Sequence, residues 1–151
     1  MKQDSADTDQ IDAAFRALTA CAPKPSPIIA CLYTGKVPNH CAPMPRNPAP
    51  AVGQPIDQNL TETLARAVAL NEAVHDGAIM IGRPHAGKPY RITGWSFRLL
   101  PPDGATQSTL NRGSAFHSSL SMSQVDGVDR VYLASKGSLL LFQSGGWSVL
   151  A

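Results

Sequence analysis

The chain has 151 residues, of which 43% are hydrophobic and 16% are charged, and its formal net charge is +2. A chain of this length and composition can bury one core, so we expect a single globular domain. The small net charge and the scattered basic residues argue against binding to a nucleic-acid polymer. No apolar run approaches the roughly 18 residues of a membrane span, and the N-terminus is polar. We therefore expect a soluble, cytoplasmic protein that does not associate with membranes.

The N-terminal part of the chain predicts one helix and one strand. Residues 1–8 are polar, and we expect them to be disordered. From there to about Ala20, apolar residues recur at helical spacing behind a cap at Thr8 or Asp9. The run 28–34 is continuous, apolar and rich in strand formers, which predicts a buried strand.

A long loop and a second helix follow. Nine of the thirteen prolines lie before position 56, and residues 35–56 have no helical or strand periodicity. Because proline cannot donate to a strand ladder, this segment predicts an extended surface loop. Asn59 and Glu62 then form a candidate N-cap pair for a helix whose apolar stripe runs through Leu70.

The second half of the chain predicts a hairpin, a short polar helix over 113–123 and three further strands. The hairpin turn contains Gly82-x-x-x-x-Gly87-Lys88, but flanking prolines and the lack of a following helix argue against a phosphate-binding loop. The order of elements predicts an α/β fold with a mixed central sheet flanked by helices. The predicted strands of this half cover 78–81, 90–97, 130–135, 138–143 and 147–150.

Three cysteines, Cys21, Cys31 and Cys41, recur every ten residues, and His40 lies beside the last of them. Zinc sites usually bring their ligands in close pairs such as Cys-x-x-Cys, which this chain lacks. An odd number of cysteines in an intracellular chain also argues against a disulfide framework. We therefore expect unliganded thiols.

Residues 74–81, which contain Asp76-Gly77-Ala78, resemble the Asp-Gly-Ala signature of the diadenylate cyclase domain. Gly53-x-Pro55 and a Leu-bearing helix lie upstream, and Trp95-x-Phe97-x-Leu99-Leu100-Pro101 lies downstream at a spacing similar to that of the family. The resemblance extends over residues 11–150. It implies one diadenylate-cyclase-like domain over residues 9–151, with the proline-rich loop 35–56 as an elaboration.

A second segment, residues 113–124, resembles the family motif in which Gly-Thr-Arg-His-Arg opens a helix. Here Ala115, Phe116 and His117 stand where the family has Arg, His and Arg, so the guanidinium groups that would neutralise a triphosphate are missing. Residues 134–137 likewise resemble a shortened Ser-Glu-Glu-x-Gly motif, with Lys136 in place of an acid.

The resemblance implies a ligand cleft between the Asp76 turn and the helix that starts near Gly113. Asp76 would hold Mg²⁺ or Mn²⁺ together with a nucleotide, and it would be catalytic if the domain were active. From the residues alone, Asp76 could equally serve only to shape a turn, since Asp-Gly is a common turn pair. Trp95 and Phe97 are two residues apart in a predicted strand, so we expect them on the same face of the sheet. Their rings form either a platform on which a base stacks or a part of the hydrophobic core. The implied ligand-binding residues are Asp76, Gly77, Ala78, Leu99, Gly113, Ser114, His117 and Ser135.

Three functions follow as hypotheses. The first is a catalytically degenerate domain that senses a purine nucleotide or a cyclic di- or oligonucleotide, in bacterial signalling or conflict systems, as a homo-oligomer or with an effector protein. The second is an active cyclase that makes c-di-AMP or a related product, with His117 replacing an arginine. The third is an interaction scaffold whose cleft is filled by Phe116 and Trp95.

Overall fold

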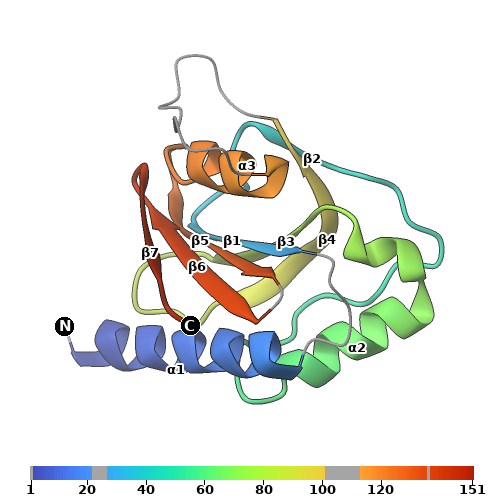
Figure 1. Ribbon diagram of the computed structural model, residues 1–151, viewed down its shortest axis with the longest axis horizontal. Coiled ribbons are helices and arrows are strands. Elements are labelled where there is room, and N and C mark those ends of the chain that lie inside the picture. The colour runs from blue at the N-terminus through green and yellow to red at the C-terminus, as the bar shows by residue number, and fades with distance from the viewer. Residues whose placement is uncertain (1, 22–26, 101–112, 136) are drawn as a thin grey trace.

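A seven-stranded mixed sheet runs through the centre of the molecule (Figure 1). The computed structural model describes residues 2–21, 27–100, 113–135 and 137–151. The strand order is β2-β4-β3-β1-β5-β6-β7, with β1 and β3 parallel and the other neighbouring pairs antiparallel. The predicted α/β class with a mixed central sheet is therefore confirmed. The strands are β1 (Ile28–Thr34), β2 (Cys41–Pro43), β3 (Ala78–Arg83), β4 (Arg91–Leu99), β5 (Val128–Ser135), β6 (Ser138–Gln143) and β7 (Gly146–Val149).

Helices cover both faces of the sheet. On one face lie α1 (Lys2–Cys21) and α2 (Leu60–Leu70), which the short 3₁₀ helix η1 (Glu72–His75) follows; α3 (Ser114–Met122) lies on the other (Figure 1). The first core layer stacks Phe15 of α1 on Tyr132 of β5, with ring centroids 4.2 Å apart. The second packs Phe116 of α3 against Phe142 of β6. None of the described helices is long and apolar enough to cross a membrane.

Two segments are more regular than the sequence predicted. Helix α1 begins at Lys2, so residues 2–8, expected to be disordered, are helical; residue 1 lies outside the described residues. Within the proline-rich loop 35–56, the three residues of β2 pair with β4 at the sheet edge. The Asn59 side chain does not cap α2; instead, the Asn59 amide donates to the Asp57 carboxylate at 2.8 Å.

Strand β4 changes face at Ser96, which corrects the expectation that Trp95 and Phe97 share a face. Ser96 is fully buried and has φ of 58°, a left-handed conformation that interrupts the strand alternation. Trp95 consequently packs in the α1 and α2 layer, where its Nε1 donates to the carbonyl of Ala51 at 2.9 Å. Phe97 packs in the α3 layer. The two rings form no common platform for a base.

Candidate functional site

The sheet register brings five of the eight predicted site residues to one end of the sheet. Ala78, the first residue of β3, lies opposite Ile29 near the start of β1 and opposite Phe97 near the end of β4. Ile28 lies opposite Ala134 near the end of β5. Asp76 and Gly77 precede Ala78, Leu99 ends β4 and Ser135 ends β5. We call this region, defined by these five residues, the Asp76 end.

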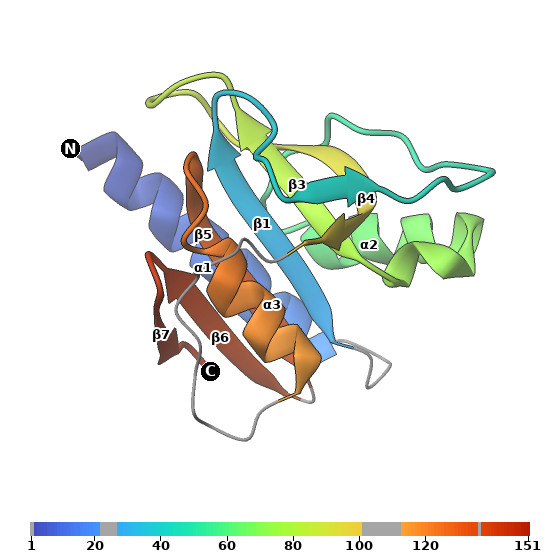
Figure 2. The same ribbon diagram turned by 90° about the horizontal axis from the view of Figure 1, so that it is seen from above.

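The other three predicted residues belong to the first turns of α3. The chain turns back after α3 into β5, so the start of α3 points toward the Asp76 end (Figure 2). Gly113 and Ser114 are exposed, and Gly113 is the N-cap in extended conformation. His117 is half-buried with its ring edge-on to Phe116. Among the described residues, no hydrogen bond or ion pair joins these three to Asp76.

The backbone of the Asp76 turn requires glycine at position 77. Gly77 has φ of +93°, which side chains of L-residues rarely adopt. A Cβ there would lie 2.8 Å from the Ser96 carbonyl carbon and 2.7 Å from Met44 Cε. On the other side of the turn, Asn71 caps η1, because its side chain accepts from the amide of Ala73 at 3.1 Å. The turn is therefore fixed by packing as well as by hydrogen bonds.

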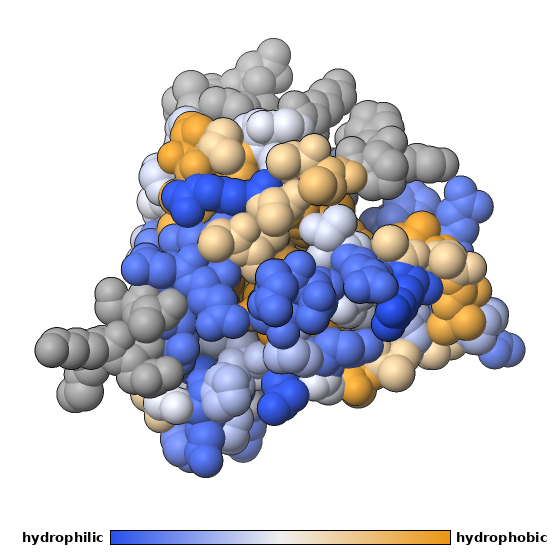
Figure 3. Space-filling view, turned by 90° about the horizontal axis from the view of Figure 1, so that it is seen from below, coloured by the Kyte–Doolittle hydropathy of each residue, from blue (hydrophilic) through white to orange (hydrophobic). Residues whose placement is uncertain are grey.

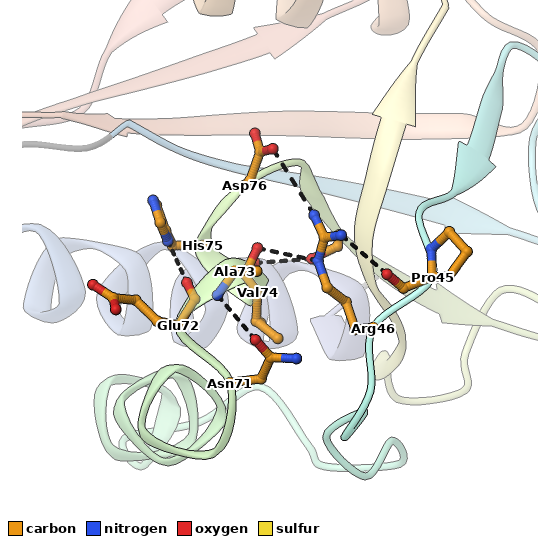
Figure 4. Close-up of polar contacts among 9 residues, drawn as sticks. Pro45, Arg46, Asn71, Glu72, Ala73, Val74, His75 and Asp76 are labelled. Atoms are coloured by element: carbon orange, nitrogen blue, oxygen red, sulfur yellow. Dashed lines mark hydrogen bonds and ion pairs between the residues drawn. The ribbon is translucent and has the colours of Figure 1, made fainter.

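Arg46, from the proline-rich loop, holds this turn against β4 (Figure 4). Its Nε lies 3.2 Å from both the Ala73 carbonyl and Ser96 Oγ, and its Nη1 donates to the Pro45 carbonyl at 3.0 Å. Its Nη2 lies 3.9 Å from Asp76 Oδ2. The Arg46 side chain is 17% exposed, whereas that of Asp76 is 74% exposed. Sequence analysis missed Arg46, since its loop has no periodicity or motif to mark it.

The described residues do not by themselves fit a divalent metal site at Asp76. Asp76 is a single exposed carboxylate with a guanidinium beside it. Among the described residues, no three His, Cys, Asp or Glu side chains lie close enough together to hold a metal ion. Mg²⁺ in proteins is usually held by one or two carboxylates and by phosphates of a substrate. We therefore assign no chemical step to a metal.

An apolar cleft of about 550 Å³ lies on the α1 and α2 side of the same turn. Its walls include Leu18, Leu64 and Val68, and His75 and Gly77 lie at the η1 side. Asp76 points away from α1 and α2 (Figure 4). Seen from this side, polar side chains cover most of the surface, and apolar ones show between them and toward one edge (Figure 3). Of the predicted ligand-binding residues, Gly77 lies in this cleft, whereas those of α3 do not.

The cysteines are free thiols with different environments. Cys31 is buried in the sheet, and burial, followed by the proximity of Cys41 and Asp129, raises its pKa to about 12. Burial also raises the pKa of the half-buried Cys41. Both thiols are therefore protonated at neutral pH, which makes them poor nucleophiles. Cys21 is exposed at the end of α1.

Comparison with known proteins gives structural matches. A hypothetical membrane spanning protein from Bacillus cereus matches with a TM-score of 0.62 and 14% identity, over 95% of this chain and 63% of that one. DacA from Staphylococcus aureus, as a double cysteine mutant, matches with a TM-score of 0.58 and 15% identity, over 100% of this chain and 90% of that one. The chain has a diadenylate-cyclase-like fold. No family model and no curated protein matches the sequence.

At 14–15% identity, the likeness concerns the fold alone. The chain also spans less than two thirds of the length of the B. cereus protein. Two positions of the family-like motifs, Pro101 and Lys136, lie outside the described residues.

Proposed function

We propose that this diadenylate-cyclase-like domain binds a purine nucleotide or a cyclic dinucleotide at the Asp76 end and does not synthesise one. The observation that carries the proposal is the strand register, by which Asp76, Gly77, Ala78, Leu99 and Ser135 share one end of the sheet. The start of α3 points to the same end (Figure 2). The fold similarity to DacA supports a nucleotide-related role for the domain.

Each part of a nucleotide has a suitable group in this region. The exposed carboxylate of Asp76 accepts hydrogen bonds from ribose hydroxyls, and the half-buried Leu99 offers apolar surface to a base. The amides that open α3 favour a phosphate, because the N-terminus of a helix carries unpaired donors and a positive partial charge. Ser114 and His117 lie beside those amides.

Synthesis of a cyclic nucleotide needs cations beside the phosphates, and the motif at the start of α3 lacks them. Loss of an arginine that stabilises a phosphoryl-transfer transition state costs on the order of a thousandfold in rate. At the motif positions, Ala115 has no polar group, and Phe116 is buried against Phe142 and Trp147. Arg46 approaches Asp76, but its guanidinium is engaged by backbone carbonyls and Ser96. Binding without turnover is what a sensor requires.

The scaffold alternative is weakened by the position of the two aromatic residues that it invokes. Phe116 belongs to the core layer beneath α3, and Trp95 belongs to the layer beneath α1 and α2. They lie on opposite faces of the sheet, so they do not jointly fill one cleft. We therefore retain nucleotide binding as the proposed function.

Calorimetry with ATP and with c-di-AMP tests the proposal. We expect a binding heat with at least one of them, weakened about tenfold in Asp76→Asn, because a hydrogen bond to a charged group contributes about 1.5–3 kcal/mol. The matched control is Asp126→Asn, an exposed aspartate in the turn between α3 and β5, at the other end of the sheet. Binding should be unchanged in this control. No heat with either nucleotide at high protein concentration would contradict the proposal.

Incubation with ATP and Mn²⁺, followed by chromatography, tests the absence of synthesis. We expect no cyclic product. A product that disappears in Asp76→Asn and persists in Asp126→Asn would instead make the domain an enzyme and overturn this part of the proposal.

A further inference from the structure

A second cavity lies at the opposite end of the sheet from Asp76. It has a volume of about 610 Å³ and is bordered by the end of β1, the end of β3, the start of β4 and the turn between β3 and β4. We call it the hairpin-end cavity. Because β1 and β3 are parallel neighbours, it lies at the carboxyl ends of both strands, where ligands commonly bind in α/β sheets. The residues that matter here are Tyr33, Gly82, Arg83, Lys88, Arg91 and Thr93.

The described lining of this cavity is basic. Arg83, Lys88 and Arg91 contribute three positive charges, and none of the described lining residues is acidic. These three charges exceed the net charge of +2 of the entire chain. A concave surface lined by charges of one sign concentrates ions of the opposite sign. The charge of this lining therefore favours anions over cations.

Arg83 is held in one orientation at the cavity wall. Its Nε donates to Thr34 Oγ1 at 2.9 Å, and its guanidinium carbon lies 4.4 Å from the centroid of the Tyr90 ring. Behind it, Asp129 Oδ2 accepts from Thr34 at 2.6 Å and from Tyr90 at 2.5 Å. A guanidinium that is already oriented loses little conformational entropy when it binds an anion.

The floor of the cavity is rigid as well. The Tyr33 ring lies against Gly82, where a Cβ would come within 2.4 Å of the ring. The hydroxyls of Tyr33 and Thr93 are 2.8 Å apart, and Thr93 donates to the Met80 carbonyl at 3.2 Å. These hydroxyls are engaged with each other and with the backbone. Recognition therefore depends on the basic side chains.

Arg91 and Lys88 complete the site from two sides. Arg91 Nη1 donates to the Gly53 carbonyl at 3.0 Å, which anchors the guanidinium beside the cavity, and Lys88 is exposed in the β3–β4 turn. One carboxylate carries a single charge, whereas a pyrophosphate group carries several and presents oxygens in more than one direction. Arginine forks match phosphate oxygens in geometry and charge.

We propose that the hairpin-end cavity is an anion-binding site for the pyrophosphate group of a small molecule. The side chains of Arg83, Lys88 and Arg91 bind the anion. This site is distinct from the Asp76 end, and its argument does not depend on the proposed function. The phosphate chain of a nucleotide and a free inorganic polyphosphate share this chemistry, so the experiment separates them.

Calorimetry of the full chain with inorganic pyrophosphate at low ionic strength provides the first test. We expect pyrophosphate to bind with an affinity that falls as salt is added. The affinity should fall about tenfold in Lys88→Gln and about tenfold in Arg91→Gln, since one charged hydrogen bond contributes about a factor of ten. The matched control is Arg66→Gln, which removes an exposed arginine from α2 on the other side of the molecule. No binding, or equal weakening in the control, would overturn the proposal.

Two further measurements localise the site. In amide NMR spectra, pyrophosphate should shift Gly35, Gly82 and Lys88, and shifts confined to the Asp76 turn would contradict the proposal. Arg91→Lys keeps the charge but loses the planar guanidinium fork. We therefore expect its affinity for pyrophosphate to lie between those of wild type and Arg91→Gln. Circular dichroism of each variant confirms that the domain is folded.

The Lys88→Gln, Arg91→Gln double variant separates the two sources of phosphate and the two proposed sites. Pyrophosphate should no longer bind it. If ATP still binds the double variant, it occupies the Asp76 end. The hairpin-end cavity then binds a phosphate ligand that has no base, such as inorganic polyphosphate. If the double variant binds neither ATP nor pyrophosphate, the hairpin-end cavity holds the phosphates of both ligands. This outcome would contradict the proposed function, which places the nucleotide at the Asp76 end.

Discussion

The two ends of the sheet use their arginines in different ways. At the Asp76 end, Arg46 is nearly buried and donates to two carbonyls and to Ser96. At the hairpin end, Lys88 and Arg91 are exposed at a cavity. The cation at the first end fixes the backbone, whereas Lys88 and Arg91 at the second end face solvent, where a ligand could reach them.

This difference has a consequence for recognition. A ligand at the Asp76 end would depend on backbone geometry, because the cation of that end, Arg46, is engaged within the protein. A ligand at the hairpin end depends on charge, and its affinity should fall with salt. Changes in backbone conformation should therefore damage the first end most, and changes of basic residues should damage the second.

The largest effect should come from Gly77→Ala. The new Cβ requires a strained φ and meets the Ser96 backbone at 2.8 Å, where no flexible side chain can yield. Strain and overpacking each cost about 1–3 kcal/mol, so we expect the free energy of unfolding to fall by about 3 kcal/mol. Urea denaturation measures the change, and nucleotide binding should be lost with it.

Gly87→Ala is the matched control for that substitution. Gly87 has φ of +89°, close to that of Gly77, but no atom lies within 4 Å of its hypothetical Cβ. We expect a loss of about 1 kcal/mol from the backbone alone. Equal losses in the two variants would mean that packing against Ser96 does not fix the Asp76 turn.

Arg46→Ala should cost less, about 2 kcal/mol. It removes the donors to the Ala73 and Pro45 carbonyls, so the backbone of the turn loses its hydrogen bond from the Arg46 guanidinium. The control is Arg66→Ala, whose exposed ion pair with Glu62 contributes less than about 0.5 kcal/mol. If Arg46→Ala is as mild as this control, Arg46 does not hold the turn.

Much of the fold could be predicted from the sequence, because periodicity and turn residues report local structure. The strand at 28–34 and the helix ending at Leu70 have the predicted bounds to within a residue. The three residues of β2 could not be found, since they include a proline and become a strand only by pairing with β4. Helix α1 begins before the apolar repeat that marked it, so its start was not visible either.

The site was less predictable than the fold. The Asp76-Gly77 turn carries a recognisable dipeptide, and the register places it with Leu99 and Ser135. The reversal at Ser96 has no sequence signal, because serine is not among the residues enriched at positive φ. Arg46 acts through a contact with a segment about thirty positions away, and no local pattern reports such a contact.

The smallest expected effect on stability concerns the hydrogen bond between Tyr90 and Asp129, which lie behind Arg83 at the hairpin end. Burial, followed by the hydrogen bond to Asp129, raises the pKa of Tyr90 from 10.0 to about 12. A folded-state pKa above that of the unfolded chain gives a stabilisation that is present below pH 10 and is lost as the pH rises toward 12. Because the ring is half-buried and solvent screens it, we expect a contribution of about 1 kcal/mol.

Tyr90→Phe isolates this contribution in urea denaturation at a series of pH values. At pH 8 the variant should be about 1 kcal/mol less stable than wild type, and the difference should vanish as the pH approaches 12. Tyr132, whose pKa is also raised by burial and by its hydrogen bond to Asp12, is present in both proteins, so its effect cancels. A difference that stays constant over this range would mean that the Tyr90 hydroxyl does not hold Asp129. The link from the Tyr90 hydroxyl through Asp129 and Thr34 would then not contribute to the orientation of Arg83 at the hairpin end.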